Sequence, residues 1–283
     1  MACDGLHQDT DRYVFEVLAP HLRVSLRAAK ATTQWTDNVA QHLVKLHQEG
    51  KTRADVEGAL QGLPVHPAMK RGVQAVKARV DPQATFLCLS NSNSVFIDTI
   101  LRHHGLENQF DEIITNPAHF RDDGLLELKR RVDPNGPQHN CTVGCSPNMC
   151  KGAELEEFMK RHGGWAAFDQ VVYVGDGGND YCPLKHLRSC VFFFLPRLSP
   201  PDRRRPRRDA VIRSPFRRAS WLTSLGAPPS VLHPTLRGDL ALVRMYRELS
   251  RRITKEGDAL RCTVVPWGGA WEVEKILTEQ VGK

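Results

Sequence analysis

Two aspartates, separated by Gly-Gly-Asn, follow a short apolar run near the middle of the chain. The stretch reads VVYVGDGGNDYCPLKHL over residues 171–187, and it places Asp176 and Asp180 directly after the apolar residues 171–174. Carboxylate oxygens are ligands that Mg²⁺ prefers, and glycines allow a loop backbone to approach a bound group closely. The spacing predicts a magnesium site formed by Asp176 and Asp180, with a glycine-rich acidic turn as the alternative.

A second polar cluster, SNSN over residues 90–93, follows the apolar run of residues 84–89. A hydroxyl group at the end of a strand that leads into a helix suits a phosphate, because the helix dipole and the backbone N–H groups favour an anion. We therefore take Ser90 and Asn91 as candidate phosphate- or substrate-binding residues. The plainer alternative is that this cluster caps the helix that begins near Ser94.

Lys151 begins a predicted helix over residues 151–164, KGAELEEFMKRHGG. A cation at a helix N-terminus opposes the helix dipole. This mismatch favours a role for Lys151 in neutralising a phosphate, and an exposed surface lysine is the alternative.

The elements that must position these residues form an alternating pattern. Apolar runs at 84–89, 110–116, 171–174 and 190–195 predict strands, and helices are expected between them. The alternation predicts an α/β fold with a doubly wound parallel sheet, in which sites lie at the carboxyl ends of the strands. Helical patterns dominate residues 11–62, and LLELKRR suggests a strand of a hairpin. Near the C-terminus we expect a helix over 240–253, a strand over 262–267 and a helix over 271–280.

Charge is distributed unevenly along the chain. The formal net charge is +7, and residues 197–218 alone contain nine Arg and two Asp, so the remainder is neutral. The basic character therefore belongs to one segment, which argues against a nucleic-acid-binding face. No run of apolar residues is long enough for a membrane span, and we expect a cytoplasmic protein.

Eight cysteines are present, and reduced thiols are expected because the N-terminus does not resemble a secretory signal. Cys88 and Cys190 lie in apolar runs and are expected to be buried. The short spacing of His139, Cys141, Cys145 and Cys150 leaves two interpretations open, of which local packing is favoured over a zinc site.

The order of these motifs resembles that of the haloacid-dehalogenase-like phosphohydrolases. The segments LSNSNSVFIDTIL, ITNPAHF, HNCTVGCSPNMCK and VVYVGDGGNDYCPL, and also TVVPW near the C-terminus, are similar to the phosphoethanolamine/phosphocholine phosphatase family, including its pyridoxal phosphate phosphatase-like branch. The resemblance covers residues 9–195 and 240–280. It implies a small helical cap at 9–65, an α/β core at 66–195 and 236–283, and an Arg/Pro-rich disordered insert at 196–235.

The resemblance also implies a two-step, Mg²⁺-dependent phosphatase acting on a small phosphorylated metabolite. One Asp attacks phosphorus to form an aspartyl-phosphate, and a second Asp serves as acid and base. By the same resemblance Ser90 holds a phosphoryl oxygen, Lys151 neutralises the phosphoryl charge, and Asp176 binds Mg²⁺. Asp180 binds the metal directly or through water, or positions the loop. Asn91 departs from family members that have Asp at this position, which puts a preference for cationic amine substrates in doubt.

The first motif of that family, a strand ending in Asp-x-Asp-x-Thr/Ser, has no match in this sequence. Its second Asp corresponds to Ala2, and its nucleophile would fall before Met1. In the family this strand is central, between the strands that end at Ser90 and Val174. We therefore expect a truncated form of a working phosphatase. A catalytically inactive phosphate-binding protein with a regulatory or interaction role is the alternative.

Overall fold

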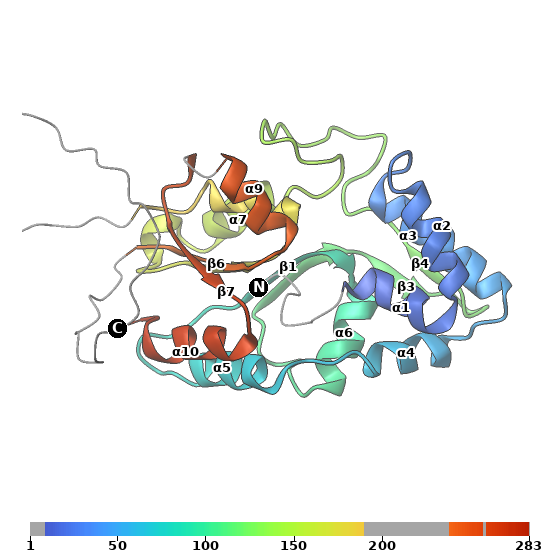
Figure 1. Cartoon of the computed structure of the whole chain (residues 1–283), viewed down its shortest axis with the longest axis horizontal. Helices are drawn as coiled ribbons and strands as arrows, with labels where there is room; N and C mark the ends of the chain where they lie inside the picture. Colours follow the sequence, from blue (N-terminus) through green and yellow to red (C-terminus); the bar gives the residue numbers. More distant parts are fainter. Residues whose placement is uncertain (1–8, 190–237, 257–258, 283) are drawn as a thin grey trace, which may run out of the picture. The chain divides into compact units, whose positions relative to one another are not determined.

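The computed structural model describes residues 9–189, 238–256 and 259–282. Helices form the first part of this chain. They are α1 (Thr10–Leu18), α2 (Pro20–Ala29), α3 (Trp35–Gln48), α4 (Arg53–Gln61) and α5 (Pro67–Lys77), and Figure 1 shows the first four in blue. Pro20 begins α2, as its fixed φ favours. Thr52 and Asp55 form a capping box at the start of α4.

The helices α1–α4 share one apolar core. Val14 and Phe15 of α1, Leu43 of α3 and Leu60 of α4 are buried in it, together with Phe96. Phe96 belongs to α6 (Ser94–His103), and the same core contacts the antiparallel hairpin of β3 (Ala118–Phe120) and β4 (Leu126–Leu128). The hairpin suggested by LLELKRR is therefore present.

The strands form two parallel sheets. In one, β1 (Leu87–Asn93) pairs with β2 (Glu112–Asn116); in the other, β6 (Leu240–Arg244) lies between β5 (Val172–Gly175) and β7 (Thr263–Trp267). Parallel strands joined by helical connections define the α/β class, which confirms that prediction.

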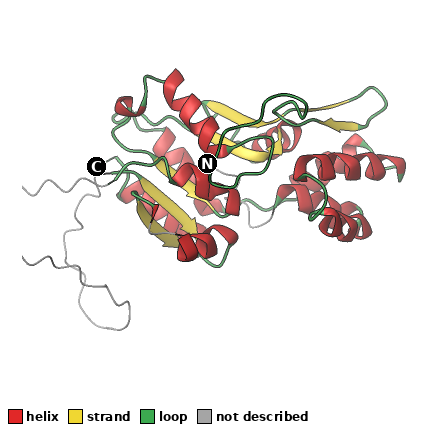
Figure 2. Ribbon diagram, turned by 90° about the horizontal axis from the view of Figure 1, so that it is seen from above, coloured by secondary structure: helices red, strands yellow, loops and turns green. Residues whose placement is uncertain are grey.

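Helices cover both faces of the second sheet. Val174, Leu240 and Leu242 face α5 and α10 (Ala270–Glu279), which lie side by side in Figure 1. Tyr173, Ala241 and Val243 face the opposite side, where α7 (Lys151–Arg161), α8 (Tyr181–Leu184) and α9 (Glu248–Glu256) pack. Successive residues of a strand point to opposite faces, so each strand contributes to both cores. Figure 2 shows the helices flanking the strands.

One predicted element was wrong. The sequence pattern over residues 240–253 predicts a single helix, but the structure has strand β6 at Leu240–Arg244 and helix α9 at Glu248–Glu256. All five residues of β6 are buried, because it is a central strand with helices on both faces. Such a strand shows no polar-apolar alternation, and its apolar run is hard to distinguish from a buried helix.

The strand predicted over residues 84–89 is shifted towards the C-terminus. Strand β1 runs from Leu87 to Asn93, so the SNSN residues lie within its end and not in a loop after it. The Asn116 side chain donates hydrogen bonds to the carbonyl oxygens of Asn91 and Ser92, both of 2.8 Å. This side chain from β2 satisfies backbone groups that a polar loop would otherwise expose to water.

Within the described residues, no strand ladder joins β1 to β5. A cavity of about 240 Å³ is lined by Leu87 and Leu89 of β1 and by Val172 and Val174 of β5. The cap and core boundaries stay predictions. Cys88 is buried as expected, and residues 190–195 and the insert at 196–235 lie outside the described residues.

Arg188 and Asp239 bring the two ends of the described core together across residues 190–237. The Asp239 carboxylate is completely buried, and it accepts hydrogen bonds from Arg188 N at 2.6 Å, Arg188 Nη2 at 2.8 Å and Val171 N at 2.8 Å. The core therefore closes at this point by contacts of its own.

Replacing residues 196–235, the insert expected from the sequence, with a short Gly/Ser linker should leave the free energy of unfolding unchanged or raise it slightly. The Arg188–Asp239 contacts need no residue from this segment, and each halving of a connection's length lowers the closure entropy cost by about 0.6 kcal/mol. Urea unfolding of the shortened chain checks this. A loss of cooperative unfolding would show that the segment contributes to the core, and the matched control is the shortened chain with Asp239→Asn, which should unfold more readily.

Candidate functional site

One cavity of about 450 Å³ brings the predicted site residues together. Ser90, Asn91, Lys151, Asp176 and Asp180 all line it. Ser90 and Asn91 lie at the carboxyl end of β1, Asp176 follows β5, and Lys151 begins α7. Carboxyl ends of parallel strands meet at one edge of the fold, which explains why residues far apart in sequence converge here.

Lys151 and Asp180, two of the residues that line this cavity, form a buried ion pair. Lys151 Nζ lies 2.6 Å from Asp180 Oδ1, and the side chains are only 5% and 1% exposed. Buried charges are strongly destabilising unless they are paired and hydrogen-bonded. The pair therefore fixes the position of the Lys151 ammonium group against the loop that follows β5.

The Asp180 carboxylate accepts hydrogen bonds from four donors. Tyr173 Oη and Lys151 Nζ donate to Oδ1, at 2.7 and 2.6 Å. The backbone N–H groups of Asp176 and Gly177 donate to Oδ2, at 3.1 and 2.9 Å. These contacts occupy most of the acceptor capacity of a carboxylate. Of the three roles that the sequence left open for Asp180, this geometry favours positioning of the loop.

Asp176 has a different environment from Asp180. Its side chain is 27% exposed, and its Oδ2 atom lies 3.9 Å from both Arg244 Nη1 and Arg247 Nε. Arg244 ends β6, directly beside the carboxyl end of β5. Both arginines fall in the segment predicted as one continuous helix, and that prediction does not place them beside Asp176.

Ser90 and Asn91 are tied to the surrounding loops. Ser90 Oγ accepts a hydrogen bond of 3.2 Å from Ser92 N, and Asn91 Oδ1 accepts one of 2.9 Å from Asn179 Nδ2. The helix α6 is capped by Asn93, whose Oδ1 accepts from Phe96 N at 3.0 Å. The capping function proposed as an alternative for this cluster therefore falls to Asn93, and Ser90 and Asn91 remain at the cavity.

Three further carboxylates, those of Asp9, Asp11 and Glu248, line the cavity and were not predicted as site residues. Asp9 caps α1, and Asp11 lies in its first turn. Asp11 is buried, and its oxygens accept hydrogen bonds of 2.8 Å from Trp35 Nε1 and 3.2 Å from Ser92 Oγ. Burial, reinforced by the charge of Asp9, raises the pKa of Asp11 to about 7. The signal available in the sequence was an Asp-x-Asp pair at the start of the first helix.

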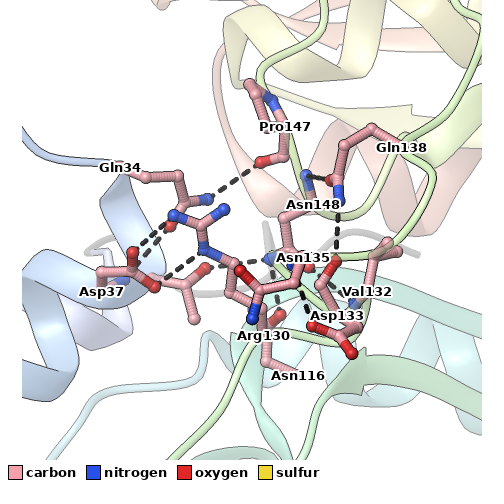
Figure 3. A network of polar contacts seen from close by, with 11 residues as sticks. Gln34, Asp37, Asn116, Arg130, Val132, Asp133, Asn135, Gln138, Pro147 and Asn148 are labelled. Atoms are coloured by element: carbon pink, nitrogen blue, oxygen red, sulfur yellow. Dashed lines mark hydrogen bonds and ion pairs between the residues drawn. The ribbon is translucent and has the colours of Figure 1, made fainter.

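The loop between β4 and α7 is held against α3 by a network of amide side chains (Figure 3). Asn148 Nδ2 donates to Asn116 Oδ1 at 2.8 Å, and Asn148 Oδ1 accepts from Val132 N at 3.1 Å. Gln34 Nε2 donates to the Pro147 carbonyl at 3.1 Å, and Arg130 forms a bidentate ion pair with Asp37. These contacts fix the segment that immediately precedes Lys151.

None of the helices in the described part of the chain is long and apolar enough to cross a membrane. The prediction of a cytoplasmic protein without nucleic-acid or membrane partners stays a prediction.

Several characterised or curated proteins are similar to this chain. Inorganic pyrophosphatase 1 of Arabidopsis thaliana is 33% identical over 153 residues, which cover 54% of this chain and 50% of the relative. Probable phosphatase phospho2 of Xenopus tropicalis is 35% identical over 158 residues, covering 55% and 63%. Pyridoxal phosphate phosphatase PHOSPHO2 of Homo sapiens is 32% identical over 169 residues, covering 59% and 67%. The chain thus spans about half to two thirds of the length of these relatives.

One solved structure and one family model are also similar to this chain. A solved HAD family hydrolase from Salmonella enterica superposes with a TM-score of 0.45 at 15% identity, over 64% of this chain and 56% of that chain. The family model described as Putative Phosphatase matches residues 6–201, which is more than half of the sequence and includes Ser90, Lys151 and Asp176. The chain therefore belongs to the Putative Phosphatase family.

Proposed function

We propose that this chain carries the phosphate- and metal-binding part of a Mg²⁺-dependent phosphomonoesterase that acts on a small phosphorylated metabolite. The observation that carries the proposal is the single cavity lined by Ser90, Asn91, Lys151 and Asp176. Membership of the Putative Phosphatase family and relatives named as phosphatases support it.

In this proposal Lys151 binds and neutralises the phosphoryl group. Its ammonium group is held by Asp180 at the N-terminus of α7, where the backbone N–H groups also favour an anion. The hydroxyl group of Ser90 and the amide of Asn91 supply hydrogen bonds at the end of β1. Together they fix the orientation of the phosphate ester relative to the strand ends.

The residues present fit a Mg²⁺ ion, because Asp176 supplies a hard, partly exposed carboxylate at the cavity. Asp176 would be its direct protein ligand, and Asp180, which already accepts four hydrogen bonds, would orient the loop. When bound, the ion offsets charge repulsion between the phosphate and its attacking group.

The nucleophile of the proposed reaction is an Asp on the strand that the family resemblance places upstream, next to β1 and β5. Attack on phosphorus by this Asp breaks the P–O ester bond and gives an aspartyl-phosphate, while the second Asp of that motif gives its proton to the departing alcohol. That Asp, now a carboxylate, takes a proton from the water that hydrolyses the aspartyl-phosphate to the free carboxylate and inorganic phosphate. The chain's own contribution is to bind the phosphoryl group with Lys151 and to hold that lysine with Asp180.

Hydrolysis of an aryl phosphate by the chain, extended at its N-terminus with the native upstream sequence, tests the proposal. We expect turnover that requires Mg²⁺ and stops with a chelator. Turnover without a divalent metal would overturn the Mg²⁺ assignment. Binding of inorganic phosphate with no turnover by the extended chain would instead favour the inactive phosphate-binding protein.

Asp176→Asn in the extended chain should lower turnover by about 1,000-fold or more and leave folding nearly intact. The loss of the metal ligand removes several kcal/mol of transition-state stabilisation, and each 1.4 kcal/mol corresponds to about tenfold in rate. The partly exposed contacts with Arg244 and Arg247 at 3.9 Å contribute little to stability. Initial rates and urea unfolding measure the two effects, with the exposed Asp98→Asn as the control. A parallel fall of rate and stability would mean that Asp176 is structural.

A further inference from the structure

Four cysteines from two parts of the chain come together next to the candidate site. The sulfur atoms of Cys141, Cys145, Cys150 and Cys182 all lie within 4.8 Å of one another, and all four residues are free thiols. We call them the four-cysteine cluster. Three of them lie in the loop before α7, and Cys182 lies in α8.

The distances within the cluster match a tetrahedral metal centre. Cys141 Sγ and Cys150 Sγ each lie 3.5 Å from Cys182 Sγ, and Cys145 Sγ lies 3.7 Å from Cys150 Sγ. Four sulfurs at the usual Zn–S distance of about 2.3 Å are separated by about 3.8 Å in a tetrahedron. The thiols are therefore already close to the arrangement that Zn²⁺ requires.

Hydrogen-bond donors and a positive charge lie around Cys141 and Cys150 of the cluster. Cys150 is the N-cap residue of α7, where the helix dipole favours a negative sulfur. Val143 N donates a hydrogen bond of 3.3 Å to Cys141 Sγ. Arg252 Nη2 donates to the Val143 carbonyl at 2.6 Å, which brings a positive charge to the same turn. The backbone between Cys141 and Cys145 bends at Gly144, which has a φ of 86°.

The sequence had grouped His139 with three of these cysteines, but the structure replaces it with Cys182. His139 Nε2 forms a hydrogen bond of 2.9 Å with the Ser146 carbonyl, and His139 Nδ1 accepts one of 3.4 Å from Cys141 N, so both ring nitrogens have backbone partners. Cys182 lies in the segment after Asp180, a different motif from the other three. No local spacing in the sequence indicates that contact.

We propose that the four-cysteine cluster binds one structural Zn²⁺ ion. Four thiolates complete a tetrahedral coordination shell and leave no open position for substrate, which is typical of a structural site and not a catalytic one. Two of the ligands, Cys150 and Cys182, are almost fully buried, at 3% and 1% exposure. The ion would join the loop before α7 to α8.

A zinc ion bound at this position would also help to hold the phosphate site in place. Cys150 immediately precedes Lys151, and Cys182 closely follows Asp180, so the metal would clamp both sides of the buried ion pair. Gly152 shows how tightly these segments pack: a Cβ atom there would lie 2.5 Å from Cys182 Sγ and 2.9 Å from His186 Nε2. The cluster thus positions Lys151 without contacting substrate through the metal.

Metal analysis of the full chain tests this proposal and requires no enzymatic activity. Protein purified without chelators under reducing conditions should contain about one zinc per chain by mass spectrometry. Cys145→Ser and Cys182→Ser should each lose most of this zinc. Cys88→Ser is the matched control, because Cys88 is also a buried thiol but lies outside the cluster, and it should keep its zinc.

Three outcomes would overturn the assignment: no zinc in the parent protein, iron in place of zinc, or zinc retained when Cys145 and Cys182 are both replaced by Ser. If the variants do not fold, cobalt substitution of the parent protein tests the proposal instead. Co²⁺ added to the zinc-depleted protein should give the intense thiolate-to-cobalt absorption of a tetrahedral sulfur site. Its absence would refute the proposal, whatever the result of the aryl phosphate assay.

Discussion

Lys151→Met should lower the free energy of unfolding by about 3–5 kcal/mol and abolish binding of inorganic phosphate. Methionine has nearly the same length as lysine, so the substitution removes the charge without opening a large cavity. Asp180 is then left with a carboxylate that is 1% exposed and lacks its counter-ion. Removing one partner of a buried pair is strongly destabilising because the remaining charge is uncompensated.

The matched control lies on the same helix. Lys160 forms an ion pair of 2.6 Å with Glu157, but both side chains are more than half exposed, at 66% and 57%. Lys160→Met should therefore leave both the stability and phosphate binding nearly unchanged. Equal losses in the two variants, measured by urea unfolding, would mean that water reaches Asp180 in solution.

A double variant separates the charge from the packing. Adding Asp180→Asn to Lys151→Met should recover part of the lost stability, because no unpaired carboxylate then remains buried. Phosphate binding, followed by titration calorimetry, should stay lost in the double variant. Recovery of binding in that variant would assign the phosphate to a group other than Lys151.

The positions of the site residues were predictable because the residues concerned sit at local boundaries. Ser90 ends an apolar run, Asp176 follows another, and Lys151 starts a helix with a charge of the unfavourable sign. In a parallel α/β fold these boundaries fall on one edge, so their convergence follows from the fold class. The pairing of Lys151 with Asp180 is a tertiary contact, and no spacing rule in the sequence predicts it.

The features that the sequence analysis predicted wrongly or missed have a common physical cause, because each depends on contacts between residues far apart in the sequence. Strand β6 looked helical because its apolar residues face helices on both sides. Arg244 joined the site through the pairing of β6 with β5, and Cys182 joined the four-cysteine cluster through packing of α8 against α7. Each depends on which elements become neighbours, which local propensity does not encode.

Asp11→Asn should stabilise the protein at pH 8 and have a much smaller effect near pH 4. The pKa of Asp11 is about 7 in the folded chain, against 3.8 for an ordinary Asp, chiefly because the carboxyl is buried. Between these values the unfolded chain has released the proton while the folded chain still holds it. The free energy of unfolding therefore falls as the pH rises through this window, and it levels off above pH 7.

The expected size of this effect follows from the pKa difference. Each unit corresponds to about 1.4 kcal/mol, so between pH 5 and pH 7 the variant should gain about 2 kcal/mol relative to the parent. Urea unfolding at several pH values measures the difference in the free energy of unfolding between variant and parent. The exposed Asp98→Asn is a control, and its difference from the parent should not change with pH in this way. A constant difference across this range would show that Asp11 is ionised throughout.

Asp9→Asn separates the two causes of the raised pKa of Asp11, which are burial and the neighbouring charge of Asp9. The groups that face Asp11 are Asp9 and Arg12 on α1, Trp35 on α3 and Ser92 on β1, and of these only Asp9 carries a negative charge. Asparagine keeps the helix cap that Asp9 provides but removes its charge. Without the charge of Asp9, the pKa of Asp11 should fall part of the way towards its ordinary value, and the pH range in which stability falls should end at a lower pH. The rise in the pKa that burial causes should remain. If that pH range did not change, burial alone would account for the pKa of Asp11.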